Sequence, residues 1–328
     1  MRLLKVEIQR FFARRLVLVG AVLSLAVVVL ALVGLWDGAK PLSDEEQAWA
    51  VSNYEEQAKY WEENGDEQIA GCYEGEAEEQ EINPAADWGC DQMTAPRLED
   101  WIGSQRELAS ALEPALADIS SLFVVLAFLL GAGFVAAEIS TGALGNWLTF
   151  EPRRVRVYAS KVAAAALGTI PIVLGLVAVF VVGAYGIFAS FDALGDLTGD
   201  VWGGVASLAG RSIALAAVVA ALGVGVGALL KHTAAALGVL VGYMIVFEGI
   251  VSGLAQAVRP YLLLVNIDAV TKGEGQYWVE VCTTEALGQS CMSDFRTVSL
   301  AHGVTVIGVL TVVVVVVAGV VFRRRDVS

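Results

Sequence analysis

The sequence has 328 residues, of which 56% are hydrophobic and 17% are charged, and its mean hydropathy is +0.65. The surface of a soluble domain of this size requires a larger number of charged residues. The composition therefore predicts an integral membrane protein. The formal net charge is −14, but residues 37–118 hold 22 acidic and 4 basic residues, and the rest of the chain is mildly basic. This distribution argues against a nucleic-acid-binding protein, which would present a basic face, and against a soluble enzyme.

Six apolar runs are long enough to cross a bilayer, which requires about 20 helical residues. They cover residues 16–36, 119–137, 162–191, 212–230, 233–258 and 297–322. The first run is longer than the apolar part of a secretory signal peptide, and no clear cleavage site follows it, so we expect a retained membrane anchor. The sequence therefore predicts an all-α integral membrane protein with six transmembrane helices.

The orientation follows from the distribution of lysine and arginine near the ends of the spans. Thirteen of the 21 basic residues and only 4 of the 35 acidic residues lie in the short segments 1–15, 138–161, 231–232 and 323–328. These segments are expected in the cytoplasm, with both termini. We expect a multi-pass protein of the cell membrane.

The first residues predict an amphipathic helix that lies at the lipid headgroups, because Leu4, Ile8 and Phe11 share one helical face opposite Lys5 and Arg10. The predicted segments then follow in chain order. They are the cytoplasmic interfacial helix 1–15, the first span 16–36, an acidic extracytoplasmic cap 37–118, the second span 119–137, a cytoplasmic helix loop 138–161, the third to fifth spans 162–258, a second extracytoplasmic segment 259–296, the sixth span 297–322 and a cytoplasmic tail 323–328.

The acidic cap is long enough to fold. Ser43 and Glu46 fit a helix capping box, and aromatic residues follow at helical spacing up to Asn64 and Gly65, where we expect the helix to end. The acidic residues of the cap are expected to keep it soluble. An alternative is that they attract cationic amphiphiles or guide a partner protein.

The four cysteines all lie in segments that the predicted topology places outside the cell. Because that side is oxidising, we expect two disulfides that tie the cap and the second outer segment. Three pairings are possible, and the preferred one is local, Cys72 with Cys90 and Cys282 with Cys291. No metal site is expected, because the chain has no CxxC motif and its two histidines lie elsewhere.

The cytoplasmic stretch after the second span predicts a short helix through Trp147 and Leu148. It is expected to end near Glu151, because the residue before Pro152 is disfavoured in a helix. Apolar side chains that include Phe150, next to a group of arginines, indicate a docking surface for another protein. The alternative is an interfacial helix whose aromatic residues rest in lipid.

This stretch resembles the cytoplasmic loop of permease subunits of ABC-2-type transporters. In that loop an acidic residue ends the second span, a Ser/Thr-Gly pair opens a short helix, and a leucine, a proline with basic residues and a lysine follow. The matching residues are Glu138, Thr141, Gly142, Leu148, Pro152, Arg153, Arg154 and Lys161. Ala143 stands where the family more often has threonine.

The resemblance implies that the loop helix docks on a separate ABC ATP-binding subunit, which binds ATP and Mg²⁺, and that two permease chains work as a homodimer or heterodimer. The residues implied in this coupling are Glu138, Thr141, Gly142, Trp147, Leu148, Phe150, Pro152, Arg153 and Arg154. The chain itself has no GxxxxGK[ST] phosphate-binding loop. Gly223, Gly225 and Gly227 lie within a span and indicate close helix packing instead.

Glu248 is the one clear acidic residue inside a predicted span, and it is the candidate for a substrate path. The alternatives are an ion pair with Arg211 or a side chain that reaches the membrane surface. No Ser-His-Asp set or HExxH motif is present, so no catalytic residue is expected in this chain.

The predicted function is the permease subunit of an ATP-driven exporter. A membrane receptor or scaffold that transports nothing, and whose acidic cap binds an envelope partner, is the alternative. A membrane transferase that acts on lipid carriers is a third possibility and would depend on Glu248 or an outer acidic residue for turnover.

Overall fold

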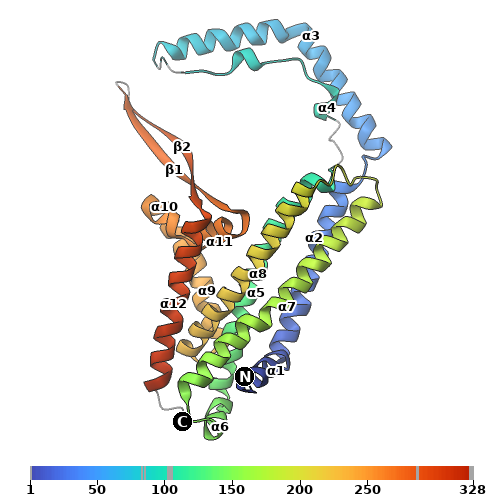
Figure 1. Ribbon diagram of the computed structural model, residues 1–328. Helices are drawn as coiled ribbons and strands as arrows, with labels where there is room; N and C mark the ends of the chain where they lie inside the picture. Colours follow the sequence, from blue (N-terminus) through green and yellow to red (C-terminus); the bar gives the residue numbers. More distant parts are fainter. Residues whose placement is uncertain (1, 83, 85, 102–105, 286–287, 325–328) are drawn as a thin grey trace. The chain divides into compact units, whose positions relative to one another are not determined.

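The computed structural model describes residues 2–82, 84, 86–101, 106–285 and 288–324 (Figure 1). The chain forms two compact units. The bundle unit comprises Met1–Trp36, Glu107–Val281 and Met292–Ser328, and the acidic unit comprises Asp37–Arg106 and Cys282–Cys291.

Six helices of the described chain are long and apolar enough to cross a membrane, which confirms the predicted number. They are α2 (Arg15–Ala39), α5 (Leu108–Ser140), α7 (Arg154–Ala189), α8 (Gly199–Leu230), the stretch Thr233–Leu254 and α12 (Leu300–Arg324). The stretch Thr233–Leu254 consists of α9 (Thr233–Tyr243), the π-helical turn η2 (Met244–Val251) and α10 (Ser252–Leu254). A 3₁₀ segment, η3 (Gln256–Tyr261), and α11 (Leu263–Lys272) follow.

Helix α5 begins well before residue 119, where the second span was expected to start. Its first amides need acceptors, and the loop between α7 and α8 supplies them. The N–H of Leu108 donates to the carbonyl of Ala193 at 2.9 Å, and that of Ala109 to the carbonyl of Leu194 at 3.2 Å. The helix therefore starts at a position fixed by a tertiary contact and not by hydropathy.

Glycines bring α5 and α8 into close contact at the centre of the bundle. A Cβ atom at Gly223 would lie 2.2 Å from the carbonyl oxygen of Phe128, and one at Gly227 would lie 2.4 Å from that of Ala132. Gly225 faces α12 instead, where a Cβ atom would lie 2.9 Å from a methyl group of Val314. The interpretation of these glycines as helix-packing residues is confirmed.

The all-α prediction needs one correction, in the segment 259–296. Strands β1 (Glu274–Glu285) and β2 (Gly288–Ser299) pair into a two-stranded sheet. Aromatic and β-branched residues such as Tyr277, Trp278 and Val279 favour this conformation. The predicted disulfide between Cys282 and Cys291 links the two strands.

The acidic unit contains α3 (Asp44–Gln80), the short η1 (Cys90–Gln92) and α4 (Leu98–Trp101). The predicted capping box begins α3: Ser43 N–H donates to the Glu46 carboxylate at 2.9 Å, and Glu46 N–H donates to the Ser43 hydroxyl at 3.3 Å. Hydrogen bonds from the Ser43 hydroxyl and amide hold the pKa of Glu46 below its usual value. The predicted disulfide between Cys72 and Cys90 is also present.

The expected end of this helix at Asn64 and Gly65 is wrong. The Asn64 side chain donates to the carbonyl of Tyr60 within the helix, and the ring of Trp61 covers Gly65. These contacts allow α3 to continue to Gln80.

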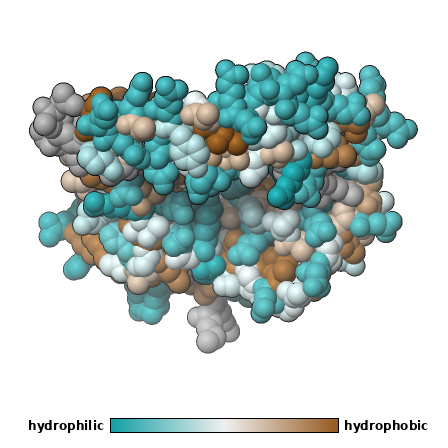
Figure 2. All heavy atoms as spheres, turned by 90° about the horizontal axis from the view of Figure 1, so that it is seen from above, coloured by the Kyte–Doolittle hydropathy of each residue, from teal (hydrophilic) through white to brown (hydrophobic). Residues whose placement is uncertain are grey.

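Figure 2 shows a face of the molecule that is mostly hydrophilic, with separate hydrophobic patches, in agreement with the many acidic residues of α3.

Replacement of Gly223 by alanine should destabilise the protein by about 1–3 kcal/mol, because the new methyl group must push two helix backbones apart. Gly210 on the same helix has open space around it, so Gly210→Ala should be neutral or stabilising through its better helix propensity. Thermal unfolding in mild detergent compares the two variants. Equal stability of both would show that the bundle does not require this close approach.

Candidate functional site

Helix α6 (Ala143–Phe150) connects α5 to α7 at one end of the bundle. Gly142 precedes it with φ +71°, a left-handed conformation that glycine adopts without strain. The Thr141 hydroxyl donates to the Ala137 carbonyl at 2.8 Å and closes the end of α5. The helix stops at Glu151, which is extended ahead of Pro152, so the predicted short helix and its end are confirmed.

The side chains of α6 divide between the bundle and the surface. Leu144 is fully buried and Trp147 is half-buried, whereas Phe150 is 83% exposed. The side chain of Leu148 lies outside the described part of the structure. Among the residues that follow, Pro152 and Arg153 are exposed and Arg154 is half-buried. The exposed end of the helix therefore offers a large aromatic ring beside basic residues.

The first helix of the chain, α1 (Arg2–Phe12), packs against α7 at the same end of the bundle. Phe11 is fully buried, and its ring meets that of Phe134 edge to face at 5.3 Å between centroids. Gly168 of α7 leaves room for this ring, since a Cβ atom there would lie 2.6 Å from it. The apolar face of α1 is thus held against the protein.

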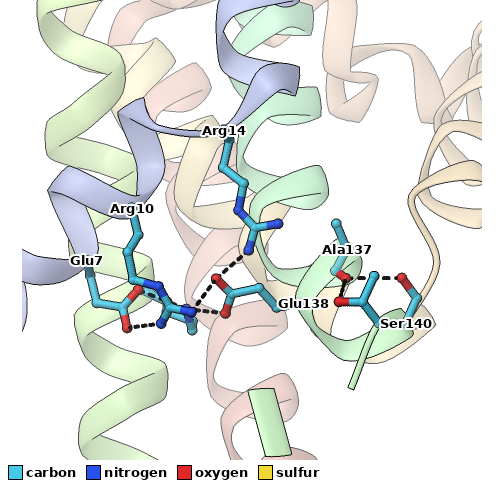
Figure 3. A network of polar contacts seen from close by, with 8 residues as sticks. Glu7, Arg10, Arg14, Ala137, Glu138 and Ser140 are labelled. Atoms are coloured by element: carbon cyan, nitrogen blue, oxygen red, sulfur yellow. Dashed lines mark hydrogen bonds and ion pairs between the residues drawn. The ribbon is translucent and has the colours of Figure 1, made fainter. Parts of the chain in front are cut away.

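Five charged side chains meet near this contact and are called the ion cluster: Glu7, Arg10, Arg14, Glu138 and Lys161. Figure 3 labels Glu7, Arg10, Arg14 and Glu138. The Lys161 ammonium lies 2.8 Å from a Glu7 oxygen and 2.5 Å from a Glu138 oxygen. Arg14 binds the other oxygen of Glu138, and Arg10 approaches that same oxygen at 3.4 Å. The ion cluster therefore joins α1, α5 and α7.

The centre of the ion cluster is removed from solvent. The side chains of Glu7 and Glu138 are 0% exposed, and that of Lys161 is 1% exposed. Buried charges persist only when they are paired, and removal of one partner leaves the others with the full cost of lost hydration. The ring of Phe134 covers the Lys161 ammonium at 4.7 Å. These contacts make the ion cluster a fixed junction.

Arg10 extends this junction to α6, because its guanidinium lies 4.7 Å from the centre of the Trp147 ring. The arrangement thus gives Trp147 and Glu138 structural contacts inside the protein, while Phe150 points away from it. Sequence reasoning missed Glu7, Arg10 and Arg14 as site residues. The sequence feature that could have indicated them is Glu7, the single acidic residue in the otherwise basic segment 1–15.

Glu248 lies at a different place, in η2, where its carboxylate accepts hydrogen bonds from the Tyr243 hydroxyl at 3.2 Å and the Leu264 N–H at 3.0 Å. It therefore binds the N-terminus of α11. Arg211, the alternative ion-pair partner considered for it, lies beside Gly273.

All four cysteines are bound in disulfides. Over residues 2–82, 84, 86–101, 106–285 and 288–324, no group of three or more His, Cys, Asp or Glu side chains is arranged to hold a metal ion.

Replacement of Lys161 by methionine should destabilise the protein by about 3–5 kcal/mol, because it leaves two buried carboxylates without their shared ammonium. Lys5→Met is the matched control, since Lys5 is an exposed lysine of α1 outside the ion cluster. Addition of Glu7→Gln to the Lys161 variant should recover part of the loss. Thermal unfolding and protease access to α1 measure both effects, and equal stability of the two lysine variants would refute the structural role of the ion cluster.

A family model described as ABC-2 family transporter protein matches residues 1–327. No curated protein and no solved structure matches the chain. The family match spans all six candidate transmembrane helices and α6.

Proposed function

The chain belongs to the ABC-2 family of transporter proteins, and we propose that it is the membrane-spanning permease subunit of an ATP-driven exporter. In this proposal a separate ABC ATP-binding subunit binds ATP and Mg²⁺ and supplies the energy. A second permease chain, identical or different, completes the transporter. The chain itself contributes no catalytic residue, in keeping with a family whose members are membrane transport components.

The observation that carries the proposal is α6. It is a short helix between two membrane-spanning helices, and it ends in an exposed Phe150 next to Pro152 and Arg153. An aromatic residue that fits a groove, surrounded by polar residues, is typical of the centre of a protein interface. We therefore assign this end of α6 as the contact with the ATP-binding subunit.

The ion cluster explains how a push on α6 would reach the membrane-spanning helices. α6 continues into α5 and α7 at its two ends, and Trp147 touches Arg10 of α1. Separation of α1, α5 and α7 would break buried ion pairs, so a force applied at α6 moves the three helices together. Within this proposal Glu248 stays the candidate for the substrate path, at the junction of η2 and α11.

Removal of the Phe150 ring should weaken binding of the ATP-binding subunit about tenfold or more, as expected for an aromatic residue at the centre of an interface. Leu254→Ala is a matched control for Phe150→Ala, because both side chains are 83% exposed and Leu254 lies on α10, distant in sequence from α6. Charge reversal at Arg153 and Arg154 should have a similar effect. Co-purification in mild detergent measures the amount of ATP-binding subunit bound to each variant.

If the wild-type chain retains no ATP-binding subunit under several mild conditions, or Phe150→Ala retains as much as Leu254→Ala, the docking role of α6 is wrong. Function that persists in cells in which every candidate ATPase is inactive would instead favour a receptor or scaffold whose acidic unit binds an envelope partner.

The proposal requires α6 in the cytoplasm, as the distribution of basic residues also predicts. Since all native cysteines are in disulfides, a single introduced cysteine can be labelled selectively. Trp49→Cys in α3 should react with a membrane-impermeant maleimide in intact cells, whereas Arg156→Cys in α7 should react only after permeabilisation. The reverse pattern would show that the chain crosses the membrane in the opposite orientation.

A further inference from the structure

A cavity of about 360 Å³ lies between the turn that joins α1 to α2 and the neighbouring part of α5. Its lining includes the two basic residues Arg14 and Arg15 and the apolar residues Leu16 and Phe134. Arg14 also belongs to the ion cluster, so the cavity opens beside that cluster. Two arginines and an apolar wall thus enclose a space of the size of a small-ligand site, which begins at about 300 Å³.

The charge around this cavity is not balanced by the protein. The ion cluster pairs two carboxylates with three cationic groups, so it carries an excess of one positive charge. Arg15 adds another, because its side chain is exposed and no carboxylate pairs with it in the part of the chain that the structure describes. A guanidinium has five N–H donors, so Arg14 can bind Glu138 and a second acceptor. The cavity therefore suits an anion that accepts several hydrogen bonds.

The apolar wall indicates what kind of anion fits. Leu16 is followed on α2 by Leu18 and Val19, whose side chains are exposed. Most of α2 is likewise not buried against the rest of the protein. Because the first residues of the spanning helix α2, including Arg15, line the cavity, it lies at the depth of the lipid headgroups. Arginines next to an apolar helix face at this depth match an amphiphile with a phosphate head and hydrocarbon chains.

We propose that this cavity binds the phosphate of an anionic phospholipid, with Arg14 and Arg15 as the donors and the acyl chains along α2. Helix α2 begins at Arg15, so the positive end of its dipole lies at the cavity and adds to the attraction for the phosphate. The lipid neutralises the excess charge beside the ion cluster and fastens the turn between α1 and α2 to the membrane. This inference does not depend on the identity of the ATP-binding partner or of the transported substrate.

The test uses the full chain in bilayer discs made of equal amounts of phosphatidylglycerol and phosphatidylcholine. Lipids that remain bound after transfer to mild detergent are counted by native mass spectrometry. The wild type should retain phosphatidylglycerol in preference, and Arg15→Gln should weaken this retention about tenfold, the effect of one lost charge-assisted hydrogen bond. Arg156→Gln removes the same charge from an exposed position on α7 outside the cavity and should retain the wild-type preference.

A second variant tests whether the lipid occupies the cavity itself, because it fills the cavity without a change of charge. Ala13 lines the cavity and is exposed, so Ala13→Phe should occupy the space without any change of charge and should cause the same loss. Circular dichroism and elution volume of both variants should equal those of the wild type, since neither position is buried.

Three results would overturn the proposal. The first is equal retention of both lipids by the wild type, and the second is a loss in Arg156→Gln as large as in Arg15→Gln, which indicates general surface attraction. The third is wild-type retention of phosphatidylglycerol by Ala13→Phe, which places the lipid elsewhere. Displacement of the retained lipid by inorganic phosphate would support the proposal, because it indicates that the lipid is held through its phosphate group.

Discussion

One buried ammonium between two buried carboxylates fixes the arrangement of this end of the bundle. Lys161 of α7 holds Glu7 of α1 and Glu138 of α5, and none of the three side chains reaches solvent. Because an unpaired charge in that position costs several kcal/mol, α1 cannot leave the bundle alone. The short α6 is therefore attached to a rigid base, and the proposed contact at Phe150 would act on three helices at once.

The second constraint lies deeper in the bundle, where α5 meets α8. Glycines allow the two backbones to touch, and a hydrogen bond between Ser212 and Ser120, 3.0 Å long and fully buried, crosses the same interface. Close contact of this kind leaves little freedom for sliding. By contrast, the stretch Thr233–Leu254 buries little of its surface against the rest of the bundle. The bundle thus combines a rigid centre with more loosely attached spans, of which Thr233–Leu254 is an example.

The sequence predicted features that depend on neighbouring residues along the chain. Hydropathy located the six spans, Pro152 located the end of α6, and the capping box located the start of α3. It failed where distant residues decide. The strands β1 and β2 stabilise each other only as a pair, and the burial of Glu138 depends on which helices surround it. The resemblance to ABC-2-type permeases marked Glu138 as a site residue but did not show that it faces inward.

The long sequence separation within the ion cluster has a consequence for biosynthesis. Glu7 and Lys161 are 154 residues apart, so Glu7 emerges from the ribosome long before its partner. Until α7 has entered the membrane, the carboxylates of Glu7 and Glu138 must stay hydrated, because Lys161 is not yet present to pair with them. Helix α1 cannot take its final position before then. A chain with an inverted or missing span would leave Lys161 on the wrong side of the bilayer. Completion of the ion cluster therefore reports that the first three spans were inserted in the correct order and direction.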